Sequence, residues 1–436
     1  LMIFMANMSW NSTMNTMEVR EHLNAKNADG ELKIPFLVVC DAFQSEMVDF
    51  ADLVLPDTTY LERHDVMSML DRPISEFDGP VDSVRIPVLE PLGECKPFQE
   101  VLVELASRLK LPAFTTPEGE RKFKDYPDFI TRFQTAPDSG IGFLTGWRGK
   151  EGDKPLKGEP NPHQWQKYAE NNCVHQYHMP LEHQYMRNWN KGYLDFSKEN
   201  ALRQKNDPIM IAIYSDILQR FRLASTGKRP GAQPPPHLKE RIYKYFDPLP
   251  FWYPPLEDQV TDLSQFTLNA ITQRPMAMYH SWDSQNAWLR QIHSHNYLYV
   301  NTATALEHGI ADGAWIWIES QWGKVKCMAR HSEAVDPGTV WTWNAIGKAE
   351  SAWSLTDNAD ESKKGFLLNH LISEELPFGG FTVSNSDPIT GQAGWYDVRV
   401  KLAPAGEDET PETWPQVKAY EVPGMTLKKE AKNEQQ

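Results

Sequence analysis

One stretch of the sequence, ITQRPMAMYHSWDSQNAWLRQI (residues 271–292), gathers neutral hydrogen-bonding side chains around two flat apolar ones. The hydrogen-bonding residues are Tyr279, His280, Ser281, Ser284, Gln285 and Asn286, and the apolar ones are Trp282 and Trp288. The stretch has no obvious nucleophile, but its amide, hydroxyl and imidazole groups can both donate and accept hydrogen bonds. It therefore favours binding of a large, neutral-edged, polyanionic ligand over acid–base chemistry.

Polar residues also follow two apolar runs near the start of the chain. The loop ANMSWNSTMNT (6–16) comes after LMIF, and Cys40 and Asp41 end the run PFLVVCD. The candidate residues here are Asn7, Ser9, Asn11, Cys40, Asp41, Ser45, Glu46 and Arg63. All but Cys40 also have a structural interpretation: a turn with Asx hydrogen bonds for Asn7, Ser9 and Asn11, a helix cap or helix start for Asp41, Ser45 and Glu46, and a surface salt bridge for Arg63.

The elements that would position these loops follow a strand–helix alternation. Residues 1–5 and 52–56 predict short strands, residues 17–25 and 45–51 predict helices, and the continuous apolar run 35–40 predicts a strand buried on both faces of a parallel sheet. This order is typical of a doubly wound α/β domain, here assigned to residues 1–111. Ligands of such sheets bind at the carboxyl ends of the strands, where these candidate residues lie.

The second half of the chain has a different pattern. Residues 112–265 are rich in proline, charge and aromatics, and we interpret them as an irregular insertion. From 266 to 404, alternating strands such as AWIWIES are separated by the turns IADG, QWGK and VDPG, which predicts a closed β-barrel. FLLNHLISEEL (366–376) predicts a helix within it, and residues 405–436 predict a disordered tail.

The bulk composition excludes several classes of function. The formal net charge of −15 over 436 residues argues against a nucleic-acid partner. The four cysteines are far apart and form no CxxC pair, so neither a disulfide framework nor a cysteine-based metal site is expected. The segment CVHQYHMPLEH (173–183) contains one cysteine and three histidines, but its spacing fits no standard zinc pattern.

Two parts of the chain, in this order, resemble the molybdopterin oxidoreductases of the dimethyl sulfoxide reductase family. The string VVCDAFQSEMVDFADLVLPDTTYLERHD resembles a signature of that family, and residues 271–400 resemble its C-terminal cofactor-binding barrel. The strings FDPLPFWYPPLED, VWTWNAIGKAESAW and SNSDPITGQAGWYDVRV are most similar to the branch of membrane-associated sulfite:quinone oxidoreductases. Polysulfide, thiosulfate and tetrathionate reductases are the neighbouring branches.

The resemblance implies a fold of class α/β plus β, in which a partial Rossmann-like doubly wound domain precedes a double-psi β-barrel. It implies a molybdenum bis(molybdopterin guanine dinucleotide) cofactor and oxidation of sulfite to sulfate. We expect the chain to be the C-terminal half of such an enzyme's catalytic polypeptide, with the [4Fe–4S] cluster in the N-terminal half. The implied partners are that half, a quinone-reducing membrane anchor and a ferredoxin-like iron–sulfur subunit, placing the chain in the cytoplasm at the membrane. A non-catalytic cofactor-binding module remains the alternative.

The resemblance also assigns roles to the candidate residues. It places the asparagines and Ser9 of the first loop, and Asp41, at dinucleotide tails, and Arg63 near a phosphate. It places Tyr279, His280, Ser281, Ser284 and Gln285 at the pterins, with Arg274 in the same turn as a structural or phosphate-contacting residue. The further contact loops contain Trp343, Asn369, Asn385 and Gln392. No residue of the chain is expected to ligate the metal, and the catalytic residues stay unassigned.

Overall fold

The computed structural model of the chain divides into two units. Unit 1 comprises Leu1–Val54, Ile217–Asp247 and Phe251–Gln436, and unit 2 comprises Leu55–Asp216 and Pro248–Pro250. The described residues are 1–68, 81–134, 142–154, 157–176, 199–200, 215–228, 233–280, 283, 286, 288–344, 346–347, 355–356, 359–378, 381–395, 397–406 and 416–417. Among them, no helix is long and apolar enough to cross a bilayer.

Unit 1 begins with a small sheet in the order β1-β2-β3, formed by Met2–Phe4, Val38–Asp41 and Leu53–Pro56. β1 and β2 are parallel, and the helix α1 (Thr16–Leu23) lies between them in sequence, as the α/β pattern predicts. β2 is fully buried, whereas Leu53 and Val54 of β3 are exposed. The helix expected over 45–51 is a single 3₁₀ turn, Val48–Phe50.

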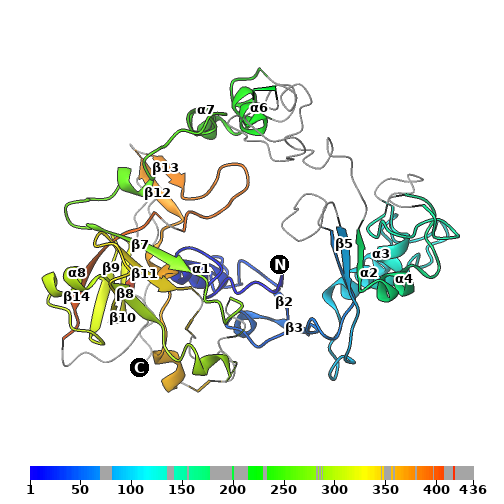
Figure 1. Ribbon diagram of the computed structural model, residues 1–436, viewed down its shortest axis with the longest axis horizontal. Helices are drawn as coiled ribbons and strands as arrows, with labels where there is room; N and C mark the ends of the chain where they lie inside the picture. The colour runs from blue at the N-terminus through cyan, green and yellow to red at the C-terminus, as the bar shows by residue number, and fades with distance from the viewer. Residues whose placement is uncertain are drawn as a thin grey trace. The chain divides into compact units, whose positions relative to one another are not determined.

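The closed barrel expected in the C-terminal part is confirmed (Figure 1). Six strands follow the order β10-β8-β11-β7-β14-β9, and β9 pairs back to β10. They are β7 (Leu268–Gln273), β8 (Tyr297–Val300), β9 (Trp315–Glu319), β10 (Gly323–His331), β11 (Thr339–Trp343) and β14 (Arg399–Pro404). A short strand, β15 (Gln416–Val417), extends β10, and the helix α8 (Thr302–Glu307) follows β8, capped by the Asn301 side chain.

The alternation of the barrel strands decides which side chains fill it. Ile316 and Ile318 of β9 are fully buried in the main core, whereas Trp315 and Trp317 between them are only half-buried. Trp341 of β11 lies opposite Tyr299 of β8, and the two rings stack with centroids 4.1 Å apart. The aromatic series of the sequence therefore packs along the strands of the barrel.

The prediction of a helix over residues 366–376 is wrong. The segment forms only the 3₁₀ turn η9 (Leu368–Leu371), followed by β12 (Glu375–Phe378), which pairs with β13 (Phe381–Ser384). The carbonyls of Asn369 and Ile372 both accept the amide of Asn15, at 3.0 and 2.8 Å, instead of continuing a helix. Every residue from 366 to 373 is buried, so the segment crosses the core without the polar face that a surface helix needs.

Two further helices of unit 1, α6 (Asp216–Ser225) and α7 (Lys239–Tyr245), precede the barrel in sequence, as do the 3₁₀ turns Pro236–Leu238 and Glu257–Gln259. The 3₁₀ turns Leu289–Gln291 and Asp360–Lys363 lie between strands of the barrel. Arg241 of α7 donates to the carbonyls of Ser384 and Ser386, at 2.7 and 2.8 Å. These two bonds hold α7 against the β13 end of the barrel region.

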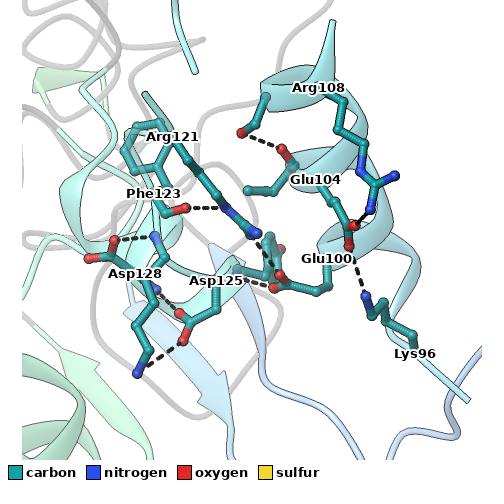
Figure 2. A network of polar contacts seen from close by, with 12 residues as sticks. Lys96, Glu100, Glu104, Arg108, Arg121, Phe123, Asp125 and Asp128 are labelled. Carbon is teal, nitrogen blue, oxygen red and sulfur yellow. Dashed lines mark hydrogen bonds and ion pairs between the residues drawn. The ribbon is translucent and has the colours of Figure 1, made fainter. Parts of the chain in front are cut away.

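Unit 2 contains an antiparallel sheet, β4-β5-β6, formed by Asp65–Ser68, Val81–Arg85 and Val174–Gln176. Its helices are α2 (Phe98–Arg108), α3 (Tyr126–Arg132) and α4 (Gln164–Glu170). Glu100 of α2 accepts from Arg121 at 2.9 Å (Figure 2). It also accepts from the amide of Tyr126 at 2.5 Å. Asp125 caps α3 by accepting the amide of Asp128, so these charges fix the start of α3 against α2.

Candidate functional site

The loop after β1 is organised by Asn7, which is buried. Its carbonyl accepts the amides of Trp10, Asn11 and Ser12 at 3.1–3.2 Å, so the loop folds back on its first residue. The Asn7 side-chain amide donates to Glu46 at 2.7 Å. Two of the predicted site residues, 39 positions apart, are thus brought together by one buried hydrogen bond.

The end of β2 is arranged in the same way. Asp41 accepts the amide of Phe43 at 3.2 Å and the hydroxyl of Ser45 at 3.0 Å, and both Asp41 and Ser45 are buried. Cys40 is buried, and its carbonyl accepts the amide of Met5. Asp41 thereby shapes the turn that leads to Glu46.

The barrel side of unit 1 holds this loop through Asn369. The Asn369 side-chain amide donates to the carbonyls of Asn11 and Thr13, each at 3.0 Å. The indole N–H of Trp10 donates to the carbonyl of Gly347 at 3.2 Å. The loop of residues 7–15 therefore lies at a seam between the small sheet and the barrel, and the structure unites Asn7, Ser9, Asn11 and Asn369 there.

Several buried polar atoms of this seam have no hydrogen-bond partner among the described residues. They include Oδ1 of Asn7, Oγ of Ser9, Oδ1 of Asn11 and Oδ1 of Asn15. Buried polar atoms of native proteins are nearly always satisfied, by protein, water or ligand. Three of the four can only accept, so a partner that satisfies them must present hydrogen-bond donors. Pterin and guanine rings carry such donors, and the residues therefore fit a pterin dinucleotide.

His370 is a feature of the seam that sequence reasoning missed. Its ring is buried against Trp10, edge to face with centroids 5.1 Å apart, and neither ring nitrogen has a partner among the described residues. Burial, and secondarily the charge of Arg20, lower the pKa of His370 to about 3, so the ring is neutral. Arg20 itself donates to the carbonyl of Ser9 at 3.1 Å. In the sequence, the one sign that His370 could belong to the site was its position beside Asn369.

The turn after β7 is less enclosed than the seam. Arg274 is exposed and Tyr279 is 52% exposed. His280 has a left-handed backbone, with φ of 52°, and its pKa is lowered by partial burial and by the charge of Arg274. A left-handed non-glycine residue is uncommon and indicates a turn fixed by its surroundings. Ser281, Ser284 and Gln285 lie outside the described residues.

The other predicted residues occupy varied surroundings. Asn385 is buried and donates to the carbonyl of Ser373 at 3.1 Å, whereas Gln392 is exposed. Trp343 ends β11 and contacts His293 with ring centroids 5.5 Å apart. Arg63 belongs to unit 2, where it forms a buried ion pair with Asp57 at 2.7 Å. That pair accounts for its charge without a phosphate.

Metal ligation has no support in the described part of the chain. No group of three or more histidine, cysteine, aspartate or glutamate residues there could hold an ion. In the segment 173–183, Cys173 and His175 are described, whereas His178 and His183 lie outside the described residues.

Comparison with known proteins identifies two family models within the chain. A family model for the molybdopterin oxidoreductases matches residues 2–108, and one for the molybdopterin dinucleotide-binding domain matches residues 268–376. The two matches contain the seam residues of both sides. A domain of the second kind implies a molybdenum–pterin cofactor.

Individual proteins also resemble this chain. A sulfite dehydrogenase subunit from Allochromatium vinosum is 66% identical over 98% of this chain and 45% of its own length. The thiosulfate reductase molybdopterin-containing subunit PhsA of Salmonella typhimurium is 25% identical over 83% of this chain and 40% of its own. Acetylene hydratase from Pelobacter acetylenicus shares the fold, with a TM-score of 0.55 at 18% identity over 93% of this chain and 44% of that one.

The chain thus spans less than half the length of these relatives. The second family model overlaps the closed barrel, and the two models together contain the residues of the polar seam. On these grounds the chain belongs to the molybdopterin oxidoreductase family.

Proposed function

We propose that the chain is the C-terminal half of the catalytic subunit of a molybdenum oxidoreductase that converts sulfite to sulfate. The observation that carries this proposal is the 66% identity to the sulfite dehydrogenase of Allochromatium vinosum along 98% of the chain. Identity to the thiosulfate reductase subunit is only 25%. That difference favours sulfite oxidation over thiosulfate, polysulfide or tetrathionate reduction.

The proposal extends to the finer architecture and the cofactor. Residues 1–111 would be the end of a Rossmann-like doubly wound domain, 112–265 an insertion, 266–404 a double-psi barrel and 405–436 a tail. The cofactor would be molybdenum bis(molybdopterin guanine dinucleotide), with a [4Fe–4S] cluster in the N-terminal half of the subunit. Electrons would pass through a ferredoxin-like subunit to a quinone-reducing membrane anchor, which would hold this cytoplasmic subunit to the membrane.

The residues of the seam would bind and orient this cofactor. When bound, the cofactor supplies the two-electron chemistry of oxygen-atom transfer, which protein side chains do not offer. Asn7 and Asn11 would accept N–H groups through their open Oδ1 atoms, and the Ser9 hydroxyl can donate or accept. Asn369 would keep the loop in place, and the packing of Trp10 on His370 would exclude water.

The molybdenum content of the protein tests this proposal. The protein would be purified from its source and its molybdenum-to-chain ratio measured by elemental mass spectrometry, followed by sulfite-dependent quinone reduction. A ratio near one with sulfite turnover is expected. A ratio near one with turnover of thiosulfate or polysulfide alone would replace the substrate, and a ratio near zero would favour a non-catalytic module.

A further inference from the structure

A small cavity at the barrel carries more positive than negative charge. Among the described residues, its charged lining consists of Arg290, Lys364 and Glu361, and His293 is a neighbouring wall residue. Two cations there face one carboxylate, so the described lining has a surplus of one positive charge in a chain of net charge −15. Such a local reversal of sign attracts anions.

The two cations share the single carboxylate between them. Arg290 contacts Glu361, and the Lys364 ammonium lies 2.6 Å from the Glu361 Oε1. The side chains of Arg290, Glu361 and Lys364 are 23%, 29% and 35% exposed, so solvent reaches all three. An arginine and a lysine converging on one carboxylate also form a geometry that suits a small oxyanion.

The other side chains around the cavity add neutral hydrogen-bonding capacity. Burial lowers the pKa of His293, so its ring is neutral near pH 7 and offers one N–H donor. Burial likewise lowers the pKa of His295, two residues further on, and the nearby charges of Lys364 and Arg290 lower it further. Within the described lining, the surplus positive charge therefore comes from Arg290 and Lys364.

The wall of the cavity is directly connected to the candidate cofactor site. Gly347 and Gly365 line it, and their backbones pack directly against each other. This approach needs glycine at 365, since a Cβ there would collide with the Ile346 carbonyl. The Gly347 carbonyl is the group that accepts the Trp10 indole N–H. The cavity and the loop of residues 7–15 are thus one hydrogen bond apart.

We propose that this cavity binds a small oxyanion of the sulfite and sulfate type through Arg290 and Lys364, and that Glu361 occupies the place of the anion when none is bound. The naming of sulfite rests on the proposed function, whereas the binding of an oxyanion rests on the cavity alone. A pyrophosphate group of the cofactor tail has related chemistry and is the other source to distinguish. The arriving anion would displace the Glu361 carboxylate from the two cations.

Isothermal titration calorimetry with sulfate, sulfite and pyrophosphate tests the site without turnover. The protein would be purified from its source, so that flanking polypeptide and cofactor are retained, and titrated without oxygen or quinone. Glu361→Gln removes the competing charge and should tighten sulfate binding about tenfold at low salt. Arg290→Gln should weaken it at least fivefold, and Arg290→Lys should retain part of the affinity. Arg330→Gln, which alters an exposed ion pair with Asp312, is the matched control and should change nothing.

The outcomes separate this inference from the proposed function. Sulfate binding that depends on Arg290 and Glu361 supports the site even if the protein does not oxidise sulfite. Sulfite turnover combined with anion binding that ignores both residues would overturn the site and leave the function intact. Binding of pyrophosphate but not of sulfate or sulfite would overturn the substrate assignment in favour of a cofactor phosphate. Absence of binding by the folded Glu361→Gln protein would overturn the site.

Discussion

Replacing Glu257 with glutamine should stabilise the barrel at alkaline pH and have little effect in acid. Glu257 is buried and accepts the indole N–H of Trp322 at 2.6 Å. Burial raises the pKa of Glu257 from 4.5 to about 7, although the Trp322 hydrogen bond opposes this, and Asp397 and Asp258 add to the increase. Arg399 lies close by but forms its two hydrogen bonds with Asp258, at 2.6 and 2.8 Å.

The direction of the pH effect follows from the raised pKa. Between pH 4.5 and 7 the unfolded chain loses the proton while the folded chain keeps it, so the folded state loses stability as pH rises. A pKa difference of this size corresponds to roughly 3 kcal/mol at pH 8, since each pKa unit equals about 1.4 kcal/mol. Glutamine keeps an acceptor for Trp322 and never ionises. We therefore expect Glu257→Gln to gain about 2–3 kcal/mol at pH 8 and under 1 kcal/mol at pH 5.

Hydrogen exchange of β9 and β10 amides, followed by mass spectrometry from pH 5 to 8, measures the opening free energy of the barrel itself. After correction for intrinsic exchange rates, the difference between variant and wild type should grow with pH. Glu333→Gln, in an exposed turn of the barrel, is the control and should show no such trend. A Glu257→Gln difference that is constant with pH, or a loss of protection at pH 8, would refute the burial argument.

Three further changes test other parts of the structure. His370→Leu removes two ring nitrogens that have no hydrogen-bond partner among the described residues and keeps an apolar side chain against Trp10, so it should not destabilise the cofactor-free chain at pH 7. Because the pKa of His370 is lowered to about 3, wild type should lose stability as pH falls below 6.5 and the variant should lose less, as thermal unfolding from pH 7 to 4 would reveal. Asn369→Leu leaves the carbonyls of Asn11 and Thr13 without their donor, should cost about 2–3 kcal/mol, and should speed hydrogen exchange in residues 7–15; unchanged exchange there would contradict the role given to Asn369. Glu100→Ala should destabilise unit 2 by about 1–2 kcal/mol in urea unfolding, whereas Glu104→Ala on the same helix, whose partners Lys96 and Arg108 are more exposed, should cost under 1 kcal/mol; equal losses would contradict the arrangement in Figure 2.

The parts of the fold that the sequence could predict depend on local periodicity. Strict alternation in AWIWIES places Ile316 and Ile318 inside and the tryptophans outside, because successive strand residues face opposite ways. The continuous apolar run before Asp41 predicts a buried parallel strand, and β2 is one. The helix predicted for FLLNHLISEEL failed because its apolar residues suit a helix as well as a buried irregular segment. The donor that binds its carbonyls, the amide of Asn15, lies more than 350 residues earlier and leaves no local pattern.

The candidate site was predictable in its loops but not in its pairings. The polar residues after β1 and β2 were expected at a ligand site, and Asn7, Ser9, Asp41 and Glu46 are all buried there. No pattern in the sequence indicates that Asn369 donates to Asn11, across 358 positions, or that Arg63 is ion-paired with Asp57. His370 illustrates the limit most clearly, because a single histidine in an apolar segment has no distinguishing spacing.

The buried polar atoms of the seam that lack hydrogen-bond partners are of a kind that a folded chain can tolerate without a ligand. The seam atoms without partners among the described residues belong to asparagine, serine and histidine, all uncharged, whereas the cations and carboxylates of the seam, such as Arg20 and Glu46, contact other groups. A buried neutral group without a partner costs about 1–3 kcal/mol, and an isolated buried charge costs far more. A ligand with N–H donors would regain part of that cost on binding. Under the proposed function, neutral groups whose unpaired state the folded chain tolerates would therefore bind the ring edges of a polyanionic cofactor.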